Sequence, residues 1–250
     1  MTQPGTAPLL GLREPRAFLI SLARRPDRRE RFYKRWARLG MTLPEPEWFP
    51  AVDGLAIPEE ERWKGLTSQP MRTVNAVYDT PGAYGCYLSH LALLRQWATE
   101  GGQRDLIVFE DDTVLASDFR TRFQTFVRSL PAEWDLLYLG GSLWDKPIRL
   151  GNHCKVTMLG TTAHYVVRGT AVERLACLLD NWQTRLPLDV MYGEMTKRGT
   201  LVAYCPPAAL AAQHAGRSDI TEYAHWDRIA PIVDLPAEPR YLNPHNFDGF

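Results

Sequence analysis

Apolar runs and helical periodicities alternate along the chain. Six short runs predict strands, and two of them, at 106–109 and 134–140, have the apolar composition of strands that are covered on both faces of a sheet. The six runs span residues 17–22, 47–51, 106–109, 134–140, 161–168 and 201–204. Elsewhere, apolar positions recur at helical spacing and predict helices. These helices span residues 26–39, 81–100, 118–130, 169–182 and 189–199.

Strand and helix units in this order are typical of the α/β fold class, with a mostly parallel central sheet flanked by helices. One domain is expected over residues 16–220, between a loosely ordered N-terminus at 1–15 and an irregular tail at 221–250 that packs on it. Residues 142–156 predict a polar connection with a hairpin. Residues 55–81 fit no regular element and are interpreted as a lid or a loop that faces a substrate.

Three consecutive carboxylates, Glu110, Asp111 and Asp112, directly follow one of these apolar runs. Burying several such charges at a strand end is costly unless a positive group neutralises them. Carboxylate oxygens suit Mg²⁺ or Mn²⁺, and ligands of open α/β sheets bind beyond the carboxyl ends of strands. The stretch therefore predicts a metal site and, with it, a phosphate-bearing substrate. The alternative is a solvated acidic turn that ends the strand.

Arginines are concentrated just after the first predicted strand. Arg24, Arg25 and Arg28 lie where a diphosphate would meet guanidinium groups and a helix N-terminus together. Ser21, near the end of the same strand, is a further candidate for ligand binding. For each arginine the alternative is a solvated basic face.

Two further segments carry candidates for ligand binding. Asp53 precedes Gly54, which is a turn signal first and a carboxylate beside a ribose second. Gly82 and Gly85 open the helix at 81–100 and allow close approach of a ligand to the backbone. His90, farther along that helix, is interpreted as a histidine at the edge of the core and not as a ligand.

Acidic and imidazole groups near the end of the domain are candidates for proton transfer and metal binding. Asp189 is predicted as the N-cap of a helix, a role that stabilises a helix by about 1 kcal/mol. A carboxylate held there also suits proton abstraction from a hydroxyl, and Glu194 is the second candidate for this role. His214, in a loop of small residues, is either a third metal ligand or a surface histidine.

Bulk composition narrows the class of protein. The chain has 250 residues, of which 45% are hydrophobic and 23% charged, with a formal net charge of zero. That balance disfavours a nucleic-acid binder driven by charge, and no apolar stretch approaches the length of a membrane span. The first residues lack the pattern of a signal peptide. The four cysteines show no C-x-x-C spacing, which favours buried thiols in a reducing cytosol over zinc ligation or disulfides.

Several stretches together resemble one family, the lipopolysaccharide glycosyltransferases of family 25, which also includes the collagen galactosyltransferases. The stretches lie between residues 19 and 220 and follow the family's order. They read ISLARRPDRRERF, FPAVDG, PGAYGCYLSHLALLRQW, LIVFEDDTVL, WDLLYLGG, TTAHYVVRGTAVERL, LPLDV and SDI. The resemblance implies a GT-A fold with a Rossmann-like nucleotide-binding half, a nucleotide-sugar donor, a divalent cation and an inverting transfer.

The resemblance also implies a metal site. Residues 110–112 resemble the family's version of the DxD signature. Asp112 would bind the cation directly, and Glu110 would face the nucleotide or share the metal. Asp111 is included among the residues that bind the donor. His214 matches only the general GT-A habit of a late metal ligand.

Other positions are matched to donor and acceptor binding. Arg24 and Arg28 resemble the family's basic residues after the first strand, and Asp189 resembles the acidic residue near the acceptor, which would act as general base. One departure is clear. The family often has Gly-Glu-Ile-Gly before its long helix, whereas this chain has Gly-Ala-Tyr-Gly at residues 82–85. A role for that loop in acid–base chemistry or acceptor choice is therefore in doubt.

A UDP-sugar, with galactose as the first choice of hexose, is the expected donor. A hydroxyl of a saccharide or of a lipid-linked glycan is the expected acceptor, in lipopolysaccharide or other surface glycan synthesis. The protein is expected in the cytoplasm, and the Arg-rich first helix offers peripheral association with the inner face of the membrane. Two rivals are a phosphatase, which needs an aspartate nucleophile where Glu110 stands, and a non-catalytic nucleotide-sugar or glycan-binding relative.

Overall fold

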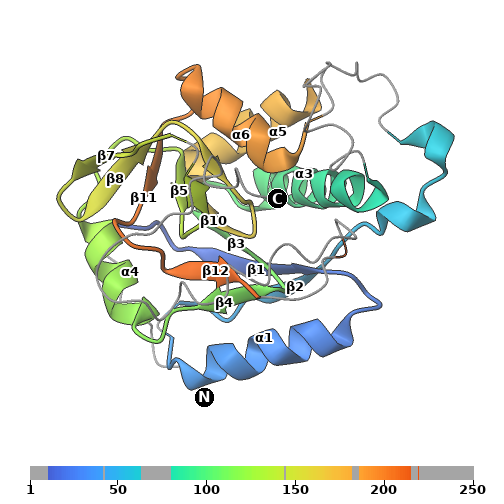
Figure 1. Cartoon of the computed structure of the whole chain (residues 1–250), viewed down its shortest axis with the longest axis horizontal. Helices are drawn as coiled ribbons and strands as arrows, with labels where there is room; N and C mark the ends of the chain where they lie inside the picture. The colour runs from blue at the N-terminus through green and yellow to red at the C-terminus, as the bar shows by residue number, and fades with distance from the viewer. Residues whose placement is uncertain are drawn as a thin grey trace, which may run out of the picture.

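A computed structural model describes residues 11–41, 43–62, 80–143, 145–181 and 186–214, together with residue 219. Its centre is an eight-stranded sheet formed by described residues (Figure 1). In spatial order the strands are β2 (Glu47–Pro50), β1 (Arg16–Ser21), β3 (Leu106–Glu110), β10 (His164–Val167), β5 (Leu136–Tyr138), β11 (Ala203–Cys205), β8 (His153–Val156) and β7 (Ile148–Leu150). Two short ladders pair β4 (Thr113–Leu115) with β12 (Ala211–Gln213) and β6 (Ser142–Leu143) with β9 (Leu159–Gly160).

The prediction of a mostly parallel sheet is correct for only part of the sheet. β1 pairs in parallel with β2 and β3, and β11 does so with β5. β10 enters between β3 and β5 antiparallel to both, and the hairpin β7–β8 adds two more antiparallel pairings. The sheet is therefore mixed. Strands that are covered on both faces are apolar throughout whatever their direction, so the sequence pattern could not reveal the reversal of β10.

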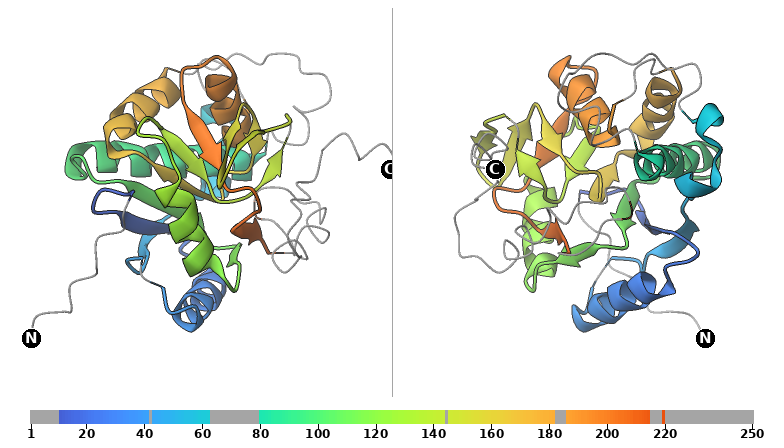
Figure 2. Two further views of the ribbon diagram at one scale, coloured as in Figure 1. Left: turned by 90° about the vertical axis from the view of Figure 1, so that its left-hand side faces the viewer. Right: turned by 45° about the vertical axis from the view of Figure 1, so that its right-hand side comes forward.

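Helices cover both faces of the sheet (Figures 1 and 2). α1 (Pro26–Arg38) and α4 (Phe119–Arg128) contribute to one core cluster, and α3 (Pro81–Glu100), α5 (Gly169–Asp180) and α6 (Leu188–Lys197) to the other. Two short 3-10 helices, η1 (Gly54–Ala56) and η2 (Glu59–Glu61), follow β2. No described helix has the length and apolarity needed to cross a membrane.

The central strand β3 places its acidic end by packing on both faces. Val108 belongs to the core cluster of α3, and Phe109 to that of α1. Phe109 contacts Phe32 and Trp36 of α1, with ring centroids 5.7 and 5.6 Å away. Burial of each such side chain contributes about 1.5–3 kcal/mol. The strand is thus fixed in depth and register, which sets where Glu110 emerges from the core.

Most local predictions agree with the structure. The helices begin and end close to their predicted bounds, and residues 148–156 form the predicted hairpin. One capping prediction is wrong: Pro187 is the N-cap of α6, and Asp189 lies within its first turn. The predicted tail at 221–250, residues 1–10 of the N-terminus and residues 63–79 of the unassigned loop lie outside the described residues.

Candidate functional site

A cavity opens at the carboxyl ends of β1 and β3, where α3 and the loop after β2 approach the sheet. Its polar lining comes from segments that are far apart in the sequence. The cavity is lined by Ser21, Arg24, Arg28, Asp53, Gly82, Cys86, Ser89, His90, Glu110, Asp111, Asp112 and Asp219, among others. The structure therefore brings most of the predicted ligand-binding residues together. This is the edge of an α/β sheet where ligands bind.

The three carboxylates after β3 have different surroundings. Asp111 accepts hydrogen bonds from Ser21 Oγ at 2.6 Å and from Arg28 Nη1 at 3.2 Å. Asp112 Oδ2 accepts from Gln213 Nε2 at 3.3 Å, whereas its Oδ1 is buried with no partner among the described residues. Burial, followed by repulsion from the two neighbouring acids, raises the pKa of Asp112 to about 8. Burial also raises the pKa of Asp111, although Ser21 and Arg28 oppose the rise.

These surroundings fit a hard divalent cation. A buried carboxylate oxygen without a partner costs free energy, which a positive ligand recovers. The donors here are carboxylate oxygens, the type that Mg²⁺ and Mn²⁺ prefer. The backbone of His214 donates to the carbonyl oxygen of Asp112 at 2.6 Å, so this histidine follows β12 directly beside the acidic segment. Its predicted role as a ligand remains a prediction.

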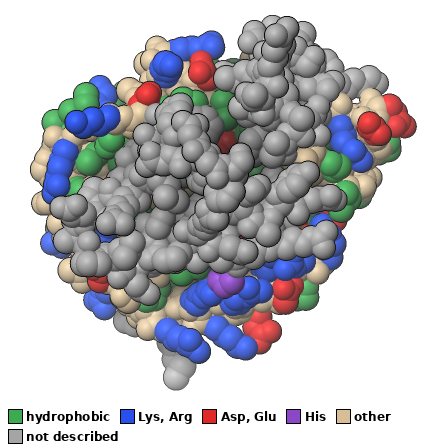
Figure 3. All heavy atoms as spheres, viewed as in Figure 1, with side chains coloured by type: hydrophobic (Ala, Val, Ile, Leu, Met, Phe, Trp, Pro, Cys, Tyr) green, Lys and Arg blue, Asp and Glu red, His purple; other side chains and the backbone are tan. Residues whose placement is uncertain are grey.

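The arginines after β1 converge on one carboxylate. Arg24 Nη1 and Arg28 Nη2 lie 3.2 and 3.3 Å from Asp219, and Arg25 pairs with it too. Arg24 also donates through Nε to Asp53 at 2.7 Å. In the structure these guanidinium groups meet an internal carboxylate, and their binding of a diphosphate stays a prediction. Other basic side chains gather on the outer surface along α1, as Figure 3 shows at its lower rim.

The loop after β2 owes its position to a close backbone contact. Asp53 Oδ1 accepts from the backbone of Leu55 at 3.1 Å and caps η1, as the turn interpretation predicts, and the residue also lines the cavity. A Cβ on Gly85 would lie 2.6 Å from the carbonyl oxygen of Val52. Gly85 therefore allows α3 to pack on this loop. Of the two glycines that begin α3, Gly82 lines the cavity and Gly85 does not.

The two acidic candidates on α6 differ in environment. Asp189 accepts from the backbone N–H groups of Thr161 at 3.1 Å and Val190 at 2.9 Å. Burial raises its pKa, these hydrogen bonds oppose the rise, and the charge of Glu110 adds to it. Glu194 instead pairs with Arg198 one turn along the helix, at 3.2 Å. Neither Glu194 nor Asp189 is among the residues that line the cavity.

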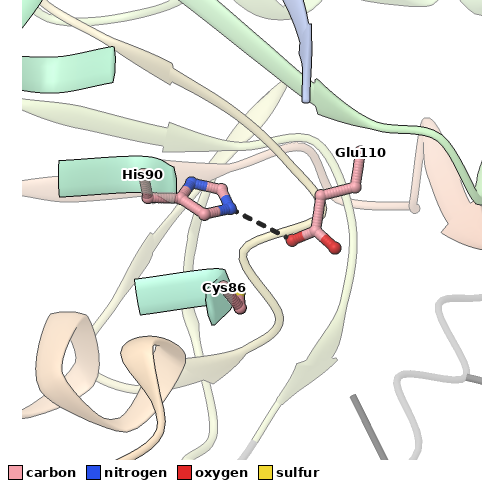
Figure 4. A group of neighbouring side chains, drawn as sticks. All are labelled: Cys86, His90 and Glu110. Carbon is pink, nitrogen blue, oxygen red and sulfur yellow. Dashed lines mark hydrogen bonds and ion pairs between the residues drawn. The ribbon is translucent and has the colours of Figure 1, made fainter. Parts of the chain in front are cut away.

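Two residues of α3, Cys86 and His90, line the cavity although the sequence did not predict them as site residues. His90 is fully buried, with Nδ1 2.8 Å from the hydroxyl of Tyr165 and Nε2 3.2 Å from Glu110 Oε1 (Figure 4). Cys86 lies one turn earlier on the same helix, and burial raises the pKa of its thiol well above the usual range. The available signal was the i, i+4 spacing of Cys86 and His90, which puts both on one helix face.

α/β proteins that bind phosphorylated ligands commonly place acids and guanidinium groups around a cavity at strand ends, as this chain does. Comparison with known families identifies the class of protein more closely. Residues 14–146, just over half of the chain, match the model of glycosyltransferase family 25, described as an LPS biosynthesis protein. The chain belongs to this family.

Curated relatives cover a similar part of the chain. The human inactive glycosyltransferase 25 family member 3 is 34% identical over 156 residues, which is 56% of this chain and 24% of the human protein. A mimivirus procollagen lysyl hydroxylase and glycosyltransferase is 33% identical over 50% of this chain and 15% of its own length. Zebrafish (Danio rerio) procollagen galactosyltransferase 1 is 33% identical over 49% and 21%. The match thus spans about a quarter or less of these relatives.

Proposed function

We propose that this protein is a metal-dependent, inverting glycosyltransferase of the GT-A type. It would move a hexose, galactose as first choice, from a UDP-sugar to a hydroxyl of a saccharide acceptor. One observation carries the proposal: Asp112, whose buried Oδ1 has no partner among the residues that the structure describes, lines the same cavity as Arg24 and Arg28. Family membership and the name of the zebrafish relative support the reaction type.

Donor binding would use both charge types in the cavity. Asp112 and Glu110 would hold the divalent cation, which when bound supplies positive charge against the leaving diphosphate. Arg24 and Arg28 would bind phosphate oxygens with their guanidinium groups after displacing Asp219. Asp53, already placed at the cavity wall, would accept from the ribose.

Proton transfer would fall to Asp189. Its two oxygens are oriented by the backbone of Thr161 and Val190, so the carboxylate is fixed before an acceptor arrives. A raised pKa makes it a stronger base toward a hydroxyl proton than an ordinary aspartate. In an inverting transfer the acceptor oxygen attacks the anomeric carbon as its proton passes to Asp189, and the sugar–phosphate bond breaks on the opposite face.

A second candidate function has its own support. The human relative is named inactive, which favours a protein that binds a nucleotide sugar or glycan without transfer. The two functions differ in the release of UDP. We expect UDP release from UDP-galactose in the presence of a saccharide acceptor and Mn²⁺, loss of release with EDTA, and recovery with added Mn²⁺. Full release in chelator would refute the metal site, and donor binding without release would favour the second function.

The biological setting follows from the same proposal. The family model is described by lipopolysaccharide synthesis, and the acceptor would then be a surface glycan or its lipid-linked precursor. If the protein transfers sugar to such a precursor at the cytoplasmic side of a membrane, the basic face of α1 would hold it weakly to anionic lipid. Cosedimentation with vesicles that contain anionic lipid tests this; the same affinity for neutral vesicles would contradict it.

A further inference from the structure

Three different ligand types meet in the wall of the cavity. Cys86 and His90 come from successive turns of α3, and Glu110 from the end of β3 (Figure 4). The thiol sulfur, a ring nitrogen and a carboxylate oxygen of these residues all lie within 4.8 Å of one another. We propose that Cys86, His90 and Glu110 form a Zn²⁺ site, which shares the Glu110 carboxylate with the divalent-cation site proposed at Asp112 and adds a thiol and an imidazole.

The chemistry of the three donors favours zinc. Thiolate and imidazole are ligands of borderline-soft ions, whereas Mg²⁺ and Mn²⁺ prefer oxygen. Zn–N and Zn–O bonds of about 2.0–2.2 Å at tetrahedral angles set their two donor atoms roughly 3.3–3.5 Å apart. His90 Nε2 and Glu110 Oε1 already lie 3.2 Å apart. The Cys86 sulfur lies within 4.8 Å of both atoms, and its proton would leave to solvent as zinc binds.

The imidazole is held for this role by a second layer of contacts. Nδ1 of His90 is 2.8 Å from the hydroxyl of Tyr165, which in turn is 3.4 Å from the hydroxyl of Tyr192. Tyr165 and Tyr192 are fully buried. Metal-binding histidines typically donate their other ring N–H to such a partner, which fixes the ring orientation. Here the orientation leaves Nε2 facing Glu110 and the cavity.

The geometry also leaves a coordination position open. All three residues line the cavity, so a fourth ligand would be water or a group of a bound molecule. Three protein ligands with one exchangeable position are typical of zinc sites that are not purely structural. Sequence spacing alone disfavoured zinc because no C-x-x-C pair occurs, but an i, i+4 pair on a helix needs no such motif.

Cobalt provides a direct test because it replaces zinc and reports thiolate ligation by absorption. The EDTA-treated full chain would be titrated with Co²⁺, and the complex then with Zn²⁺, in the absence of any nucleotide. We expect a near-ultraviolet sulfur-to-cobalt charge-transfer band that Zn²⁺ removes. Cys86→Ser should abolish the band, and His90→Gln should weaken zinc affinity at least tenfold. Cobalt binding without the band would overturn the proposal.

Matched cysteine variants exclude other sources of the band. Cys177→Ser changes an exposed cysteine and should keep the band. Cys154 faces Cys205 across β8 and β11, so a band lost in Cys154→Ser but kept in Cys86→Ser would overturn the assignment. Circular dichroism would confirm that each variant is folded. Since no sugar donor is present, failure of this test leaves the proposed transfer untouched, and failure of transfer leaves the zinc result standing.

Discussion

An aspartate with a buried carboxylate oxygen lies beside each end of β3, and the surroundings of the two aspartates differ. Asp105, just before the strand, is fully buried and accepts from the backbone N–H groups of Arg13 and Gly169, each at 2.8 Å. Asp112, just after it, keeps one buried oxygen without a partner among the described residues. The first carboxylate links loops around the core. The second is held in an unfavourable state, which is expected where a ligand completes the site.

The largest expected effect is on activity at the cavity end. Asp112→Asn keeps the shape of the side chain but removes the charge that would hold the cation. We expect sugar transfer to fall by two to three orders of magnitude, with no loss of stability, since the asparagine keeps an oxygen that accepts from Gln213 and removes the repulsion from Glu110 and Asp111. The measurement is UDP release beside a denaturation curve. Activity within threefold of the wild type would show that the carboxylate of Asp112 does not hold a cation needed for transfer.

The opposite end should respond in stability. Asp105→Ala leaves the N–H groups of Arg13 and Gly169 without their acceptor. We expect the free energy of unfolding to fall by about 2–4 kcal/mol. Urea denaturation measures it, with Asp118→Ala, whose side chain is 60% exposed, as a control that changes about 0.5 kcal/mol or less. Equal stability of the two variants would contradict the structural role of Asp105.

The pH dependence of stability tests the burial of His164, which pairs with Phe109 in the neighbouring strand near the cavity. Burial lowers the pKa of His164 from 6.5 to about 3. Below pH 6.5 the unfolded chain therefore binds a proton that the folded chain does not, so stability is complete above pH 6.5 and lost as pH falls toward 3. The loss is up to about 1.4 kcal/mol per pH unit.

Urea curves at pH 7, 6 and 5 test this contribution. We expect His164→Gln and His164→Leu to lose less stability than the wild type over that range, whatever their stability at pH 7. Parallel losses in all three proteins would mean that His164 takes up its proton in the folded state and is not held neutral by burial.

The smallest expected effect concerns the internal anion. Asp219→Asn removes the carboxylate that competes with a diphosphate for Arg24 and Arg28. Partly exposed ion pairs of this kind contribute about 0.2–1 kcal/mol, so UDP should bind up to about fivefold more tightly. Calorimetry in the presence of Mn²⁺ measures the change. Weaker binding would show that Asp219 helps to hold the ligand.

Much of the fold was predictable because local patterns and burial agree. The apolar run before Glu110, the proline that begins α1 and the helical spacing of α3 all gave correct elements. The direction of β10 was not predictable, since its apolar residues suit either pairing. The direction of β10 depends on the end of the sheet from which the chain enters the strand after the hairpin. No local sequence pattern indicates that end.

The sequence predicted which charged residues lie at the candidate site, but not the hydrogen bonds that they make with residues far away in the chain. The acids after β3 and the arginines after β1 were visible as clusters in the sequence. Asp105 and Asp112 flank the same apolar run, yet their difference depends on N–H groups from Arg13 and Gly169, far away in the chain. The contact of His90 with Glu110 likewise depends on how α3 packs on the sheet.

The most direct test of the central claim is the binding of UDP, measured by calorimetry with and without Mn²⁺, to the wild type and to Asp112→Asn. We expect UDP to bind the wild type only when Mn²⁺ is present, and we expect this binding to be lost in the variant. Binding of UDP with equal affinity in all four conditions would contradict the claim that the carboxyl end of β3 is built around a cation.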